Sequence, residues 1–257
     1  MPFLYPTQSP RVFAHRGLAL DARSRAIDEN TLEAFERANE VGATHIESDI
    51  QVTADGQAVL FHDDDLSRVA GKPLKVADLD LSELQGIRLE HGGRVPTLQE
   101  ALKEFPSALF NLDFKVAASV EAGAQTILQA KAMDRVLVAS FSDRRRRAAL
   151  ALLPESASSA GSASVLKALA ASLITNKRLR NALVGRALTG ISALQIPAAS
   201  GPLRLDGHRF LQTLEANHVE AHYWTVNEPA EMRRLVALGA SGVVTDRADL
   251  AVQELLG

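Results

Sequence analysis

Short apolar segments alternate with amphipathic segments along almost the whole 257-residue chain, and this alternation limits its possible folds more than any other feature. Apolar runs predict strands, whereas apolar side chains recurring every three or four residues predict helices. Seven or eight such repeats are typical of a parallel α/β fold. About 250 residues is also the usual length of a closed (β/α)8 barrel. The sequence therefore predicts a single (β/α)8 TIM barrel, with residues 1–257 as one domain.

The predicted strands and helices alternate along the chain. Strands are predicted at residues 11–14, 44–52, 108–115, 135–139, 193–197, 219–227 and 242–246. Helices are predicted near residues 31–42, 97–104, 117–132, 142–152, 164–188, 208–217 and 229–238, with a further helix at the end. Thr97 and Glu100 form a capping-box pattern at one helix start. Residues 154–164 are rich in serine and predict no clear element.

A small β-hairpin is predicted directly after the second strand, in residues 44–65. Asp55-Gly56 suits a tight two-residue turn, because glycine tolerates a positive φ. That turn would place Asp49 opposite His62, with their Cβ atoms roughly 5 Å apart. A glycine bulge at the turn would instead shift the register by one residue.

Carboxylates occupy one face of two predicted strands. Glu47 and Asp49 lie two residues apart, and side chains with that spacing point to the same face of a strand. Asp113 and Lys115 repeat the spacing in a later strand. A row of polar side chains on a hairpin most often faces solvent. However, no Lys or Arg separates Glu47 from Asp49, and this arrangement favours a bound cation.

Polar or aromatic residues stand at the carboxyl ends of several predicted strands. In a closed barrel these ends converge on one site. The residues are His15 and Arg16, Glu47 and Asp49, Asp113 and Lys115, Trp224, and Thr245 with Asp246. A histidine alone in a loop is more often structural than catalytic, so these residues point to a site only as a group.

Composition excludes several functional classes. A formal net charge of −3 and a pI of about 6.2 provide no electrostatic footprint for nucleic acid. The chain has no cysteine, which rules out disulfides, thiolate metal ligands and cysteine nucleophiles and fits the cytoplasm. No secretory signal pattern is expected in the first residues, and no apolar run approaches the roughly 20 residues of a membrane span. The oligomeric state stays open.

Six motifs in the right order give the chain a resemblance to the glycerophosphodiester phosphodiesterase family. They are Ala14-His15-Arg16-Gly17, Asp28-Glu29-Asn30-Thr31, Glu47-Ser48-Asp49, His62-Asp63, Trp224-Thr225-Val226-Asn227 and Gly242-Val243-Val244-Thr245-Asp246-Arg247. Two positions depart from the family pattern. Asp28 replaces the usual proline, and Asp113 stands where the family has the longer glutamate.

The resemblance implies a metal-dependent enzyme that cleaves a small glycerophosphodiester into glycerol 3-phosphate and an alcohol, through a cyclic phosphate. Oxygen-only ligands suit a hard divalent cation, Mg²⁺ or Ca²⁺, with Mn²⁺ as a further candidate. The implied metal ligands are Glu47, Asp49 and Asp113; the implied general acid and base are His15 and His62; Arg16, Lys115 and Trp224 would contact substrate, and Glu29 would support the site.

Two alternatives use the same barrel. A lysophospholipase D or phospholipase C-like activity would need an apolar docking surface, for which residues 164–188 are the candidate. A catalytically silent barrel would only bind phosphorylated ligands. The basic residues of 164–188, like the run Arg144 to Arg147, are interpreted as solvated helix faces, because four consecutive residues wrap around a helix and cannot face one ligand together.

Overall fold

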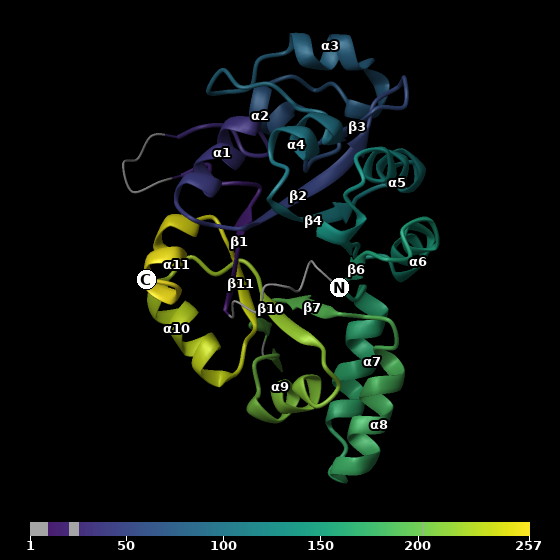
Figure 1. The fold of residues 1–257 in the computed structure, drawn as a ribbon, viewed down its shortest axis with the longest axis vertical. Helices are drawn as coiled ribbons and strands as arrows, with labels where there is room; N and C mark the ends of the chain where they lie inside the picture. Colours follow the sequence, from purple (N-terminus) through teal and green to yellow (C-terminus); the bar gives the residue numbers. More distant parts are fainter. Residues whose placement is uncertain (1–9, 21–25, 202) are drawn as a thin grey trace.

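A computed structural model describes residues 10–20, 26–201 and 203–257, so the expectation about the first residues, 1–9, lies outside the described residues. Within these ranges, eight parallel strands form a barrel surrounded by helices (Figure 1). The strands are β1 (Arg11–His15), β2 (His45–Val52), β4 (Leu109–Phe114), β5 (Val136–Ala139), β6 (Ala157–Ser158), β7 (Ala193–Ile196), β10 (Glu220–Tyr223) and β11 (Gly242–Thr245). The predicted (β/α)8 barrel is confirmed.

The barrel closes between β6 and β7, the two ends of the strand order β6-β5-β4-β2-β1-β11-β10-β7. The Ala160 amide donates to the Ala193 carbonyl at 2.9 Å, and the Ser192 amide donates to the Ser158 carbonyl at 2.8 Å. Phe13 and Val244 point into the barrel with Leu137 and Ala157, and these side chains fill its interior. Any pocket at the carboxyl ends of the strands is therefore closed at its base by these side chains.

Apart from α7 and α8, the helices begin and end close to where the sequence predicts them. They are α1 (Leu32–Glu40), α4 (Leu98–Glu104), α5 (Ser119–Gln129), α6 (Asp143–Leu152), α7 (Ser162–Ser172), α8 (Lys177–Ala187), α9 (His208–Glu215), α10 (Pro229–Leu238) and α11 (Ala248–Leu255). Thr31 caps α1 by accepting from the Ala34 amide, and Thr97 with Glu100 forms the predicted capping box. No helix in the described ranges has the length and apolar character to cross a membrane.

The strand pairing in the hairpin differs from the pairing that a two-residue turn would give. Strand β3 (Ala58–Leu60) pairs with β2 so that Val52 lies opposite Ala58 and Ile50 opposite Leu60. The loop has three residues, and its last, Gly56, has a φ of +83°. This is the glycine bulge, which adds one residue to the turn. The Asp49 carbonyl therefore accepts from the Phe61 amide at 2.9 Å, and the prediction that Asp49 lies opposite His62 is wrong.

An insertion follows the hairpin and has a small core of its own, seen above the barrel in Figure 1. It contains α2 (Ser67–Ala70), the 3-10 turn Val76–Asp78 and α3 (Leu81–Gly86). Its core includes Val59 and Phe61, whereas Ala58 and Leu60 pack into the core around β2 and β4. Alternate residues of the β3 segment thus belong to two different cores.

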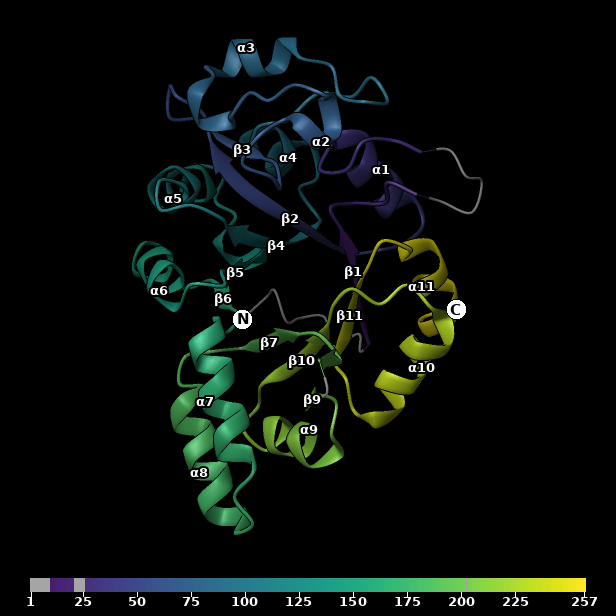
Figure 2. The ribbon, with the colours of Figure 1, turned by 180° about the vertical axis from the view of Figure 1, so that it is seen from behind.

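Residues 154–188 hold the largest departures from the predicted elements. Strand β6 lies in the serine-rich segment that predicts no element. The single helix expected at 164–188 is two helices, α7 and α8, which pack side by side and project from the barrel (Figures 1 and 2). The chain breaks there because Asn176 caps a new helix, accepting from the Leu179 amide at 3.0 Å. The Arg144 to Arg147 run is not wholly solvated either, since Arg146 is 4% exposed.

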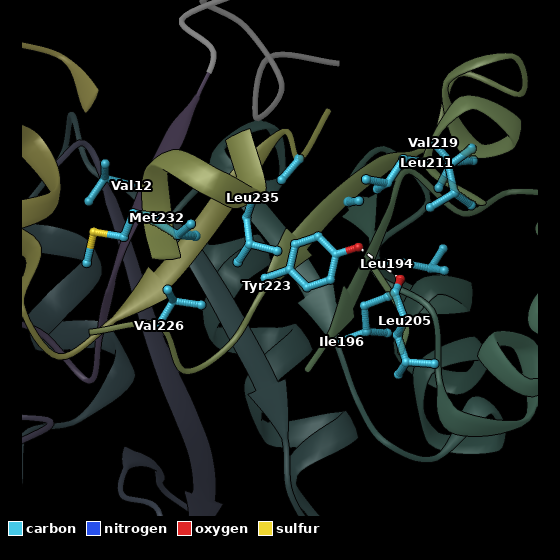
Figure 3. Packing of buried hydrophobic residues seen from close by; sticks show 14 of the residues in the cluster. Val12, Leu194, Ile196, Leu205, Leu211, Val219, Tyr223, Val226, Met232 and Leu235 are labelled. Carbon is cyan, nitrogen blue, oxygen red and sulfur yellow. Dashed lines mark hydrogen bonds between the residues drawn. The ribbon is translucent and has the colours of Figure 1, made fainter. Parts of the chain in front are cut away.

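A second core packs around the carboxyl-terminal strands and holds β10 in place (Figure 3). Tyr223 is fully buried there, and its hydroxyl donates to the Leu205 carbonyl at 3.0 Å. Leu194, Ile196 and Leu235 surround its ring in the same cluster. Tyr223 packs between the strands and the surrounding helices, whereas the next residue, Trp224, packs against the residues inside the barrel and lines the pocket at its open end.

Candidate active site

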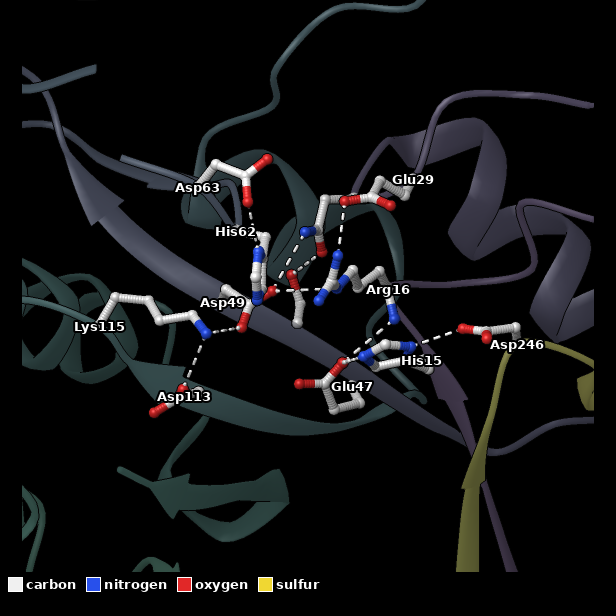
Figure 4. Close-up of polar contacts among 12 residues, drawn as sticks. His15, Arg16, Glu29, Glu47, Asp49, His62, Asp63, Asp113, Lys115 and Asp246 are labelled. Atoms are coloured by element: carbon white, nitrogen blue, oxygen red, sulfur yellow. Dashed lines mark hydrogen bonds and ion pairs between the residues drawn. The ribbon is translucent and has the colours of Figure 1, made fainter. Parts of the chain in front are cut away.

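One pocket of about 480 Å³ opens at the carboxyl ends of the strands. Eight of the predicted site residues line it: His15, Arg16, Glu47, Asp49, His62, Asp113, Lys115 and Trp224. Figure 4 shows the polar contacts among the first seven of them. Glu29 does not line the pocket. The barrel therefore brings together residues that the sequence places on five different segments.

His15 ends β1 and is held by two carboxylates. Its Nδ1 lies 2.6 Å from Asp246 Oδ1, and its Nε2 lies 3.9 Å from Glu47 Oε2. Burial alone would lower the pKa of His15, but the hydrogen bond to Asp246 and the charge of Glu47 outweigh it and raise that pKa. An ionised carboxylate can only accept, so Nδ1 donates to Asp246 and Nε2 is turned toward the pocket.

A tight turn after β1 places Arg16 against Glu47. Arg16 has a φ of +57° and Gly17 a φ of +84°. The Arg16 amide donates to the Glu47 carbonyl at 2.9 Å and to Glu47 Oε2 at 3.2 Å. A Cβ at Gly17 would lie 2.7 Å from Ala34, so only glycine fits where the turn meets α1.

Glu47 is a buried carboxylate with few compensating donors. Burial, followed by the charge of Asp49, raises its pKa to about 7. Burial also raises the pKa of Asp113, with Asp49 adding to the effect and Lys115 opposing it. The strands β2 and β4 cause this crowding, because their register sets Asp49 directly beside Asp113. Three carboxylates close together in a dry pocket resist full ionisation unless a cation joins them.

Lys115 provides part of that positive charge. Its Nζ lies 3.0 Å from Asp49 Oδ1 and 3.2 Å from Asp113 Oδ2. Burial alone would lower the pKa of Lys115, but the two carboxylates outweigh it and raise the pKa. Asn30 also donates to Asp49 Oδ2, at 3.3 Å. Asp49 is therefore the best compensated of the three carboxylates.

His62 follows β3 and reaches the pocket from the insertion. Its Nδ1 lies 2.7 Å from Asp63 Oδ1, and Arg68 Nε holds the other oxygen of Asp63 at 2.7 Å. Burial alone would raise the pKa of Asp63, but the hydrogen bonds from His62 and Arg68 outweigh it and lower that pKa. Like His15, His62 is thus oriented by an ionised aspartate.

Glu29 links Arg16, which follows β1, to Arg68 of the insertion. Its carboxylate accepts from Arg16 Nη1 at 2.8 Å and from Arg68 Nη2 at 2.5 Å. The hydrogen bond from Arg68 and the charge of Arg16 outweigh burial and lower the pKa of Glu29. Glu29 therefore orients Arg16, and any direct support of a metal stays a prediction.

Several oxygen atoms in the pocket are of the type that binds a divalent cation. Among the described residues no three His, Asp or Glu side chains already form a metal-binding group, and the Lys115 ammonium lies between two of the carboxylates. Two buried side-chain oxygens of the pocket residues nevertheless lack any hydrogen-bond partner, Asp113 Oδ1 and Asn111 Oδ1. Carboxylate and amide oxygens are the donors that Mg²⁺ and Ca²⁺ take. The chemistry of the donor set therefore fits a hard cation.

The other half of the pocket is apolar. Its lining residues there are Phe141, Val165, Leu166, Leu169, Ile196, Pro197, Leu205 and Trp224. The Phe141 and Trp224 rings meet edge to face, with centroids 6.2 Å apart and an interplanar angle of 79°. Helix α7 supplies three of these residues and so forms one wall.

Several functional contacts were missed from the sequence. Asp246 was recognised only as a strand end, although its place at the end of the last strand, opposite His15, was a usable signal. Asp63 adjoins His62, and Asn227 holds Asp246 Oδ2 at 2.8 Å. Arg68 gave no signal, because it meets Glu29 only through the fold of the insertion.

Comparison with known proteins shows which family the chain belongs to. The model of the glycerophosphoryl diester phosphodiesterase family matches residues 15–250. A Mycobacterium tuberculosis protein named "Probable glycerophosphodiester phosphodiesterase 2" is 35% identical over 238 residues, which are 92% of this chain and 87% of that protein. A lysophospholipase D of Rattus norvegicus is 26% identical over 262 residues, covering 85% of this chain and 79% of its own.

Solved structures share the fold. A glycerophosphodiester phosphodiesterase from Agrobacterium tumefaciens superposes with a TM-score of 0.75 at 21% identity, covering 96% of this chain and 99% of its own. An Oleispira antarctica phosphodiesterase, solved in complex with the product sn-glycerol-3-phosphate, has a TM-score of 0.74 at 22% identity and covers 97% and 98%. The predicted resemblance and enzyme class are confirmed. The chain belongs to the glycerophosphoryl diester phosphodiesterase family and is a phosphoric diester hydrolase.

Proposed function

We propose that the enzyme hydrolyses glycerophosphodiesters to glycerol 3-phosphate and an alcohol, with one divalent cation and with His15 and His62 as general acid and base. The main support is that one pocket holds two histidines, each oriented by its own aspartate, beside three crowded carboxylates. A cytoplasmic location is part of the proposal and rests on the absence of cysteine from the sequence.

Glu47, Asp49 and Asp113 would hold the cation. When bound, such an ion neutralises charge on the phosphoryl group and lowers the pKa of a nearby hydroxyl. Arg16 and Lys115 line the same pocket and would contact the phosphate, Arg16 through its fork and Lys115 as a point charge. The Glu29 carboxylate fixes the Arg16 side chain in advance, so little side-chain order must be gained on binding.

The two histidines would move the protons. In the first step the glycerol 2-hydroxyl attacks phosphorus, one histidine takes its proton, and the other protonates the departing alcohol. A cyclic phosphate remains. In the second step water opens the ring, with the two proton transfers reversed, to release glycerol 3-phosphate. Such acid-base help contributes roughly 10² to 10⁴ in rate.

Chelation and metal add-back test the proposal. We expect EDTA to abolish the hydrolysis of glycerophosphocholine, and Mg²⁺, Ca²⁺ or Mn²⁺ to restore it in the wild type. His62→Ala should remain at least about 10²-fold slower with any of these ions. Binding of the ion, followed by calorimetry, should persist in His62→Ala. Full wild-type activity after thorough chelation would contradict the metal mechanism.

The apolar half of the pocket favours a second candidate function, lysophospholipase D activity. Phe141 and Leu166 are 61% and 66% exposed at its rim, where an acyl chain would meet them. A relative from Rattus norvegicus carries that activity in its name. Side-by-side assays of glycerophosphocholine and lysophosphatidylcholine separate the two. If lysophospholipids are substrates, Leu166→Ser should raise KM for lysophosphatidylcholine about tenfold and leave glycerophosphocholine unaffected. Leu128→Ser, an exposed leucine on α5, is the control.

A further inference from the structure

A second cavity, of about 510 Å³, lies between α6, α7 and α8 and shares no lining residue with the active-site pocket. Figures 1 and 2 show α7 and α8 projecting side by side with α6 next to them. One face of α7, with Val165 and Leu169, lines the active site. Another face, with Ser164 and Lys167, lines this second cavity. The helix therefore separates two different sites.

The second cavity is strongly basic. Four cationic side chains line it, Arg146, Arg147, Lys167 and Arg186, and none of its lining residues is Asp or Glu. Arg147, Lys167 and Arg186 are exposed, and no ion pair joins any of them to an acidic residue in the described part of the chain. Three unpaired cations thus surround one opening.

Arg146 lies at the base of the cavity and is 4% exposed. Its Nη1 donates to Ser158 Oγ at 2.9 Å, and its Nη2 lies 3.4 Å from Asp143 Oδ1. Its Nε is buried without a hydrogen-bond partner. Asp143 is shared, since it also accepts from the Ser164 amide at 2.9 Å and the Ser164 hydroxyl at 2.7 Å. The buried guanidinium is therefore incompletely compensated.

Positive charge is concentrated in the part of the sequence that forms this cavity. Residues 143–191 carry nine of the 28 Lys and Arg but only two of the 31 Asp and Glu. The remainder of the chain is thus net negative. A concave, low-dielectric surface lined by one sign of charge concentrates counter-ions. Simple solvation of surface cations accounts for Arg147, Lys167 and Arg186, but not for Arg146, because burying a charge without full pairing is unfavourable.

We propose that this cavity is a second, non-catalytic site that binds a phosphate group, carried either by a free phosphomonoester or by the head group of an anionic lipid. A phosphate has several acceptor oxygens for the surrounding cations, and guanidinium groups match its geometry through paired hydrogen bonds. The phosphate would supply the acceptor that Arg146 Nε lacks and the negative charge that the three exposed cations lack.

Calorimetric titration of the intact enzyme with inorganic phosphate tests the site. Under the proposed function the active site would also bind phosphate, so we expect two binding events in the wild type, only one of which belongs to this cavity. Arg147→Gln/Arg186→Gln should weaken one of them at least about tenfold, a change of about 1.4 kcal/mol. Glycerophosphocholine turnover should stay unchanged, because neither residue lines the catalytic pocket. Arg146 is left intact, since its replacement would disturb the packing.

A matched control removes the same charge from the same two helices. Arg144→Gln/Arg178→Gln alters exposed residues of α6 and α8 that do not line the cavity, and it should bind phosphate like the wild type. Phosphate binding that is unchanged in Arg147→Gln/Arg186→Gln would overturn the proposal. So would equal weakening in both double variants, since that would reflect net charge alone.

Vesicles identify the carrier of the phosphate. Phosphatidylcholine vesicles with and without phosphatidic acid are sedimented with the wild type and both double variants. Recovery with phosphatidic acid that is lost only in Arg147→Gln/Arg186→Gln supports the lipid head group. Loss of phosphate binding in that variant without any vesicle binding supports a free phosphomonoester.

Discussion

The orientation of the main polar side chains in the pocket is set by neighbouring carboxylates. His15 and His62 each depend on an aspartate, and Arg16 depends on Glu29. These partners lie one contact further from the pocket than the residues they hold. Asp246 is the clearest case, because it raises the pKa of His15 and is itself held by Asn227.

Replacement of Asp246 should therefore change the pH dependence of catalysis. In Asp246→Asn the hydrogen bond to a charged acceptor is lost, so the pKa of His15 falls. We expect the limb of the kcat/KM profile that reports His15 to move to lower pH, and kcat/KM at its optimum to fall roughly 10- to 100-fold. The pH profile of glycerophosphocholine hydrolysis measures both effects.

Asp134→Asn removes an exposed aspartate remote from the pocket and serves as the control. It should keep the wild-type profile. An unchanged profile in Asp246→Asn would mean that this aspartate does not set the protonation of His15.

At the scale of residues, the sequence predicted which side chains line one pocket but not which residues lie opposite one another. Residues from strand ends converge because the fold requires it, so eight of the predicted site residues reach one pocket. The opposition of Asp49 and His62 failed because one extra loop residue at Gly56 changes the register. Both turns suit Asp-Gly, and the sequence of the turn alone does not choose between them.

At the scale of elements, one ionic contact ties β1 to β10. Arg11 Nε and Nη2 donate to Glu220 at 2.8 and 2.9 Å, and His222 Nε2 lies 2.8 Å from the same carboxylate. Burial alone would raise the pKa of Glu220, but the hydrogen bonds from Arg11 and His222 outweigh it and lower that pKa to about 2. In the strand order of the sheet, β11 lies between these two strands.

This contact should make stability depend on pH. A carboxylate whose pKa is lower in the folded than in the unfolded state stabilises the fold. For Glu220 this stabilisation is fully present at a pH above the pKa of the unfolded state, about 4.5, and is lost as the pH falls to the folded-state pKa of about 2. We expect Glu220→Gln to lower the free energy of unfolding at pH 7 by up to about 3 kcal/mol. The difference from wild type should shrink below pH 4.5. Urea unfolding at several pH values measures it.

Glu215→Gln, an exposed glutamate on α9, is the matched control and should behave as wild type at every pH. A destabilisation by Glu220→Gln that is equally large at low pH would show that packing, not charge, is lost.

Elements with strong local signals were predicted well, and the rest depended on the barrel. Caps at Thr31 and Thr97 define their helices from the sequence. Strand β6 is only two residues long, and its pairing with β5 and its contact with β7 come from barrel closure rather than from its own composition. The break between α7 and α8 follows from the Asn176 cap, a signal that was present but was outweighed by continuous helical periodicity.

At the scale of the whole molecule, the barrel and the insertion share structure. The β3 segment supplies Ala58 and Leu60 to one core and Val59 and Phe61 to the other. That residues 1–257 form a single domain stays a prediction, and these shared contacts are its physical basis.

Calorimetry tests the single domain. Heating should give one endotherm with a calorimetric enthalpy equal to the van't Hoff enthalpy, as expected when all parts unfold together. Val59→Ala, which removes packing only from the core of the insertion, should shift the entire endotherm to lower temperature. Two resolved transitions, with only one of them shifted by Val59→Ala, would show that the insertion unfolds separately.

The position of β3 between two cores also limits how the enzyme can move. Phe61 is bonded to the backbone of Asp49 and buried in the insertion, and His62 is the next residue. The insertion therefore cannot swing open like a lid without breaking the pairing of β3 with β2. His62 keeps its place before substrate arrives, so turnover at this side of the site does not wait for a closing motion. The opposite wall differs, because it is formed by α7, which belongs to the projecting pair of helices and has no such pairing to a barrel strand.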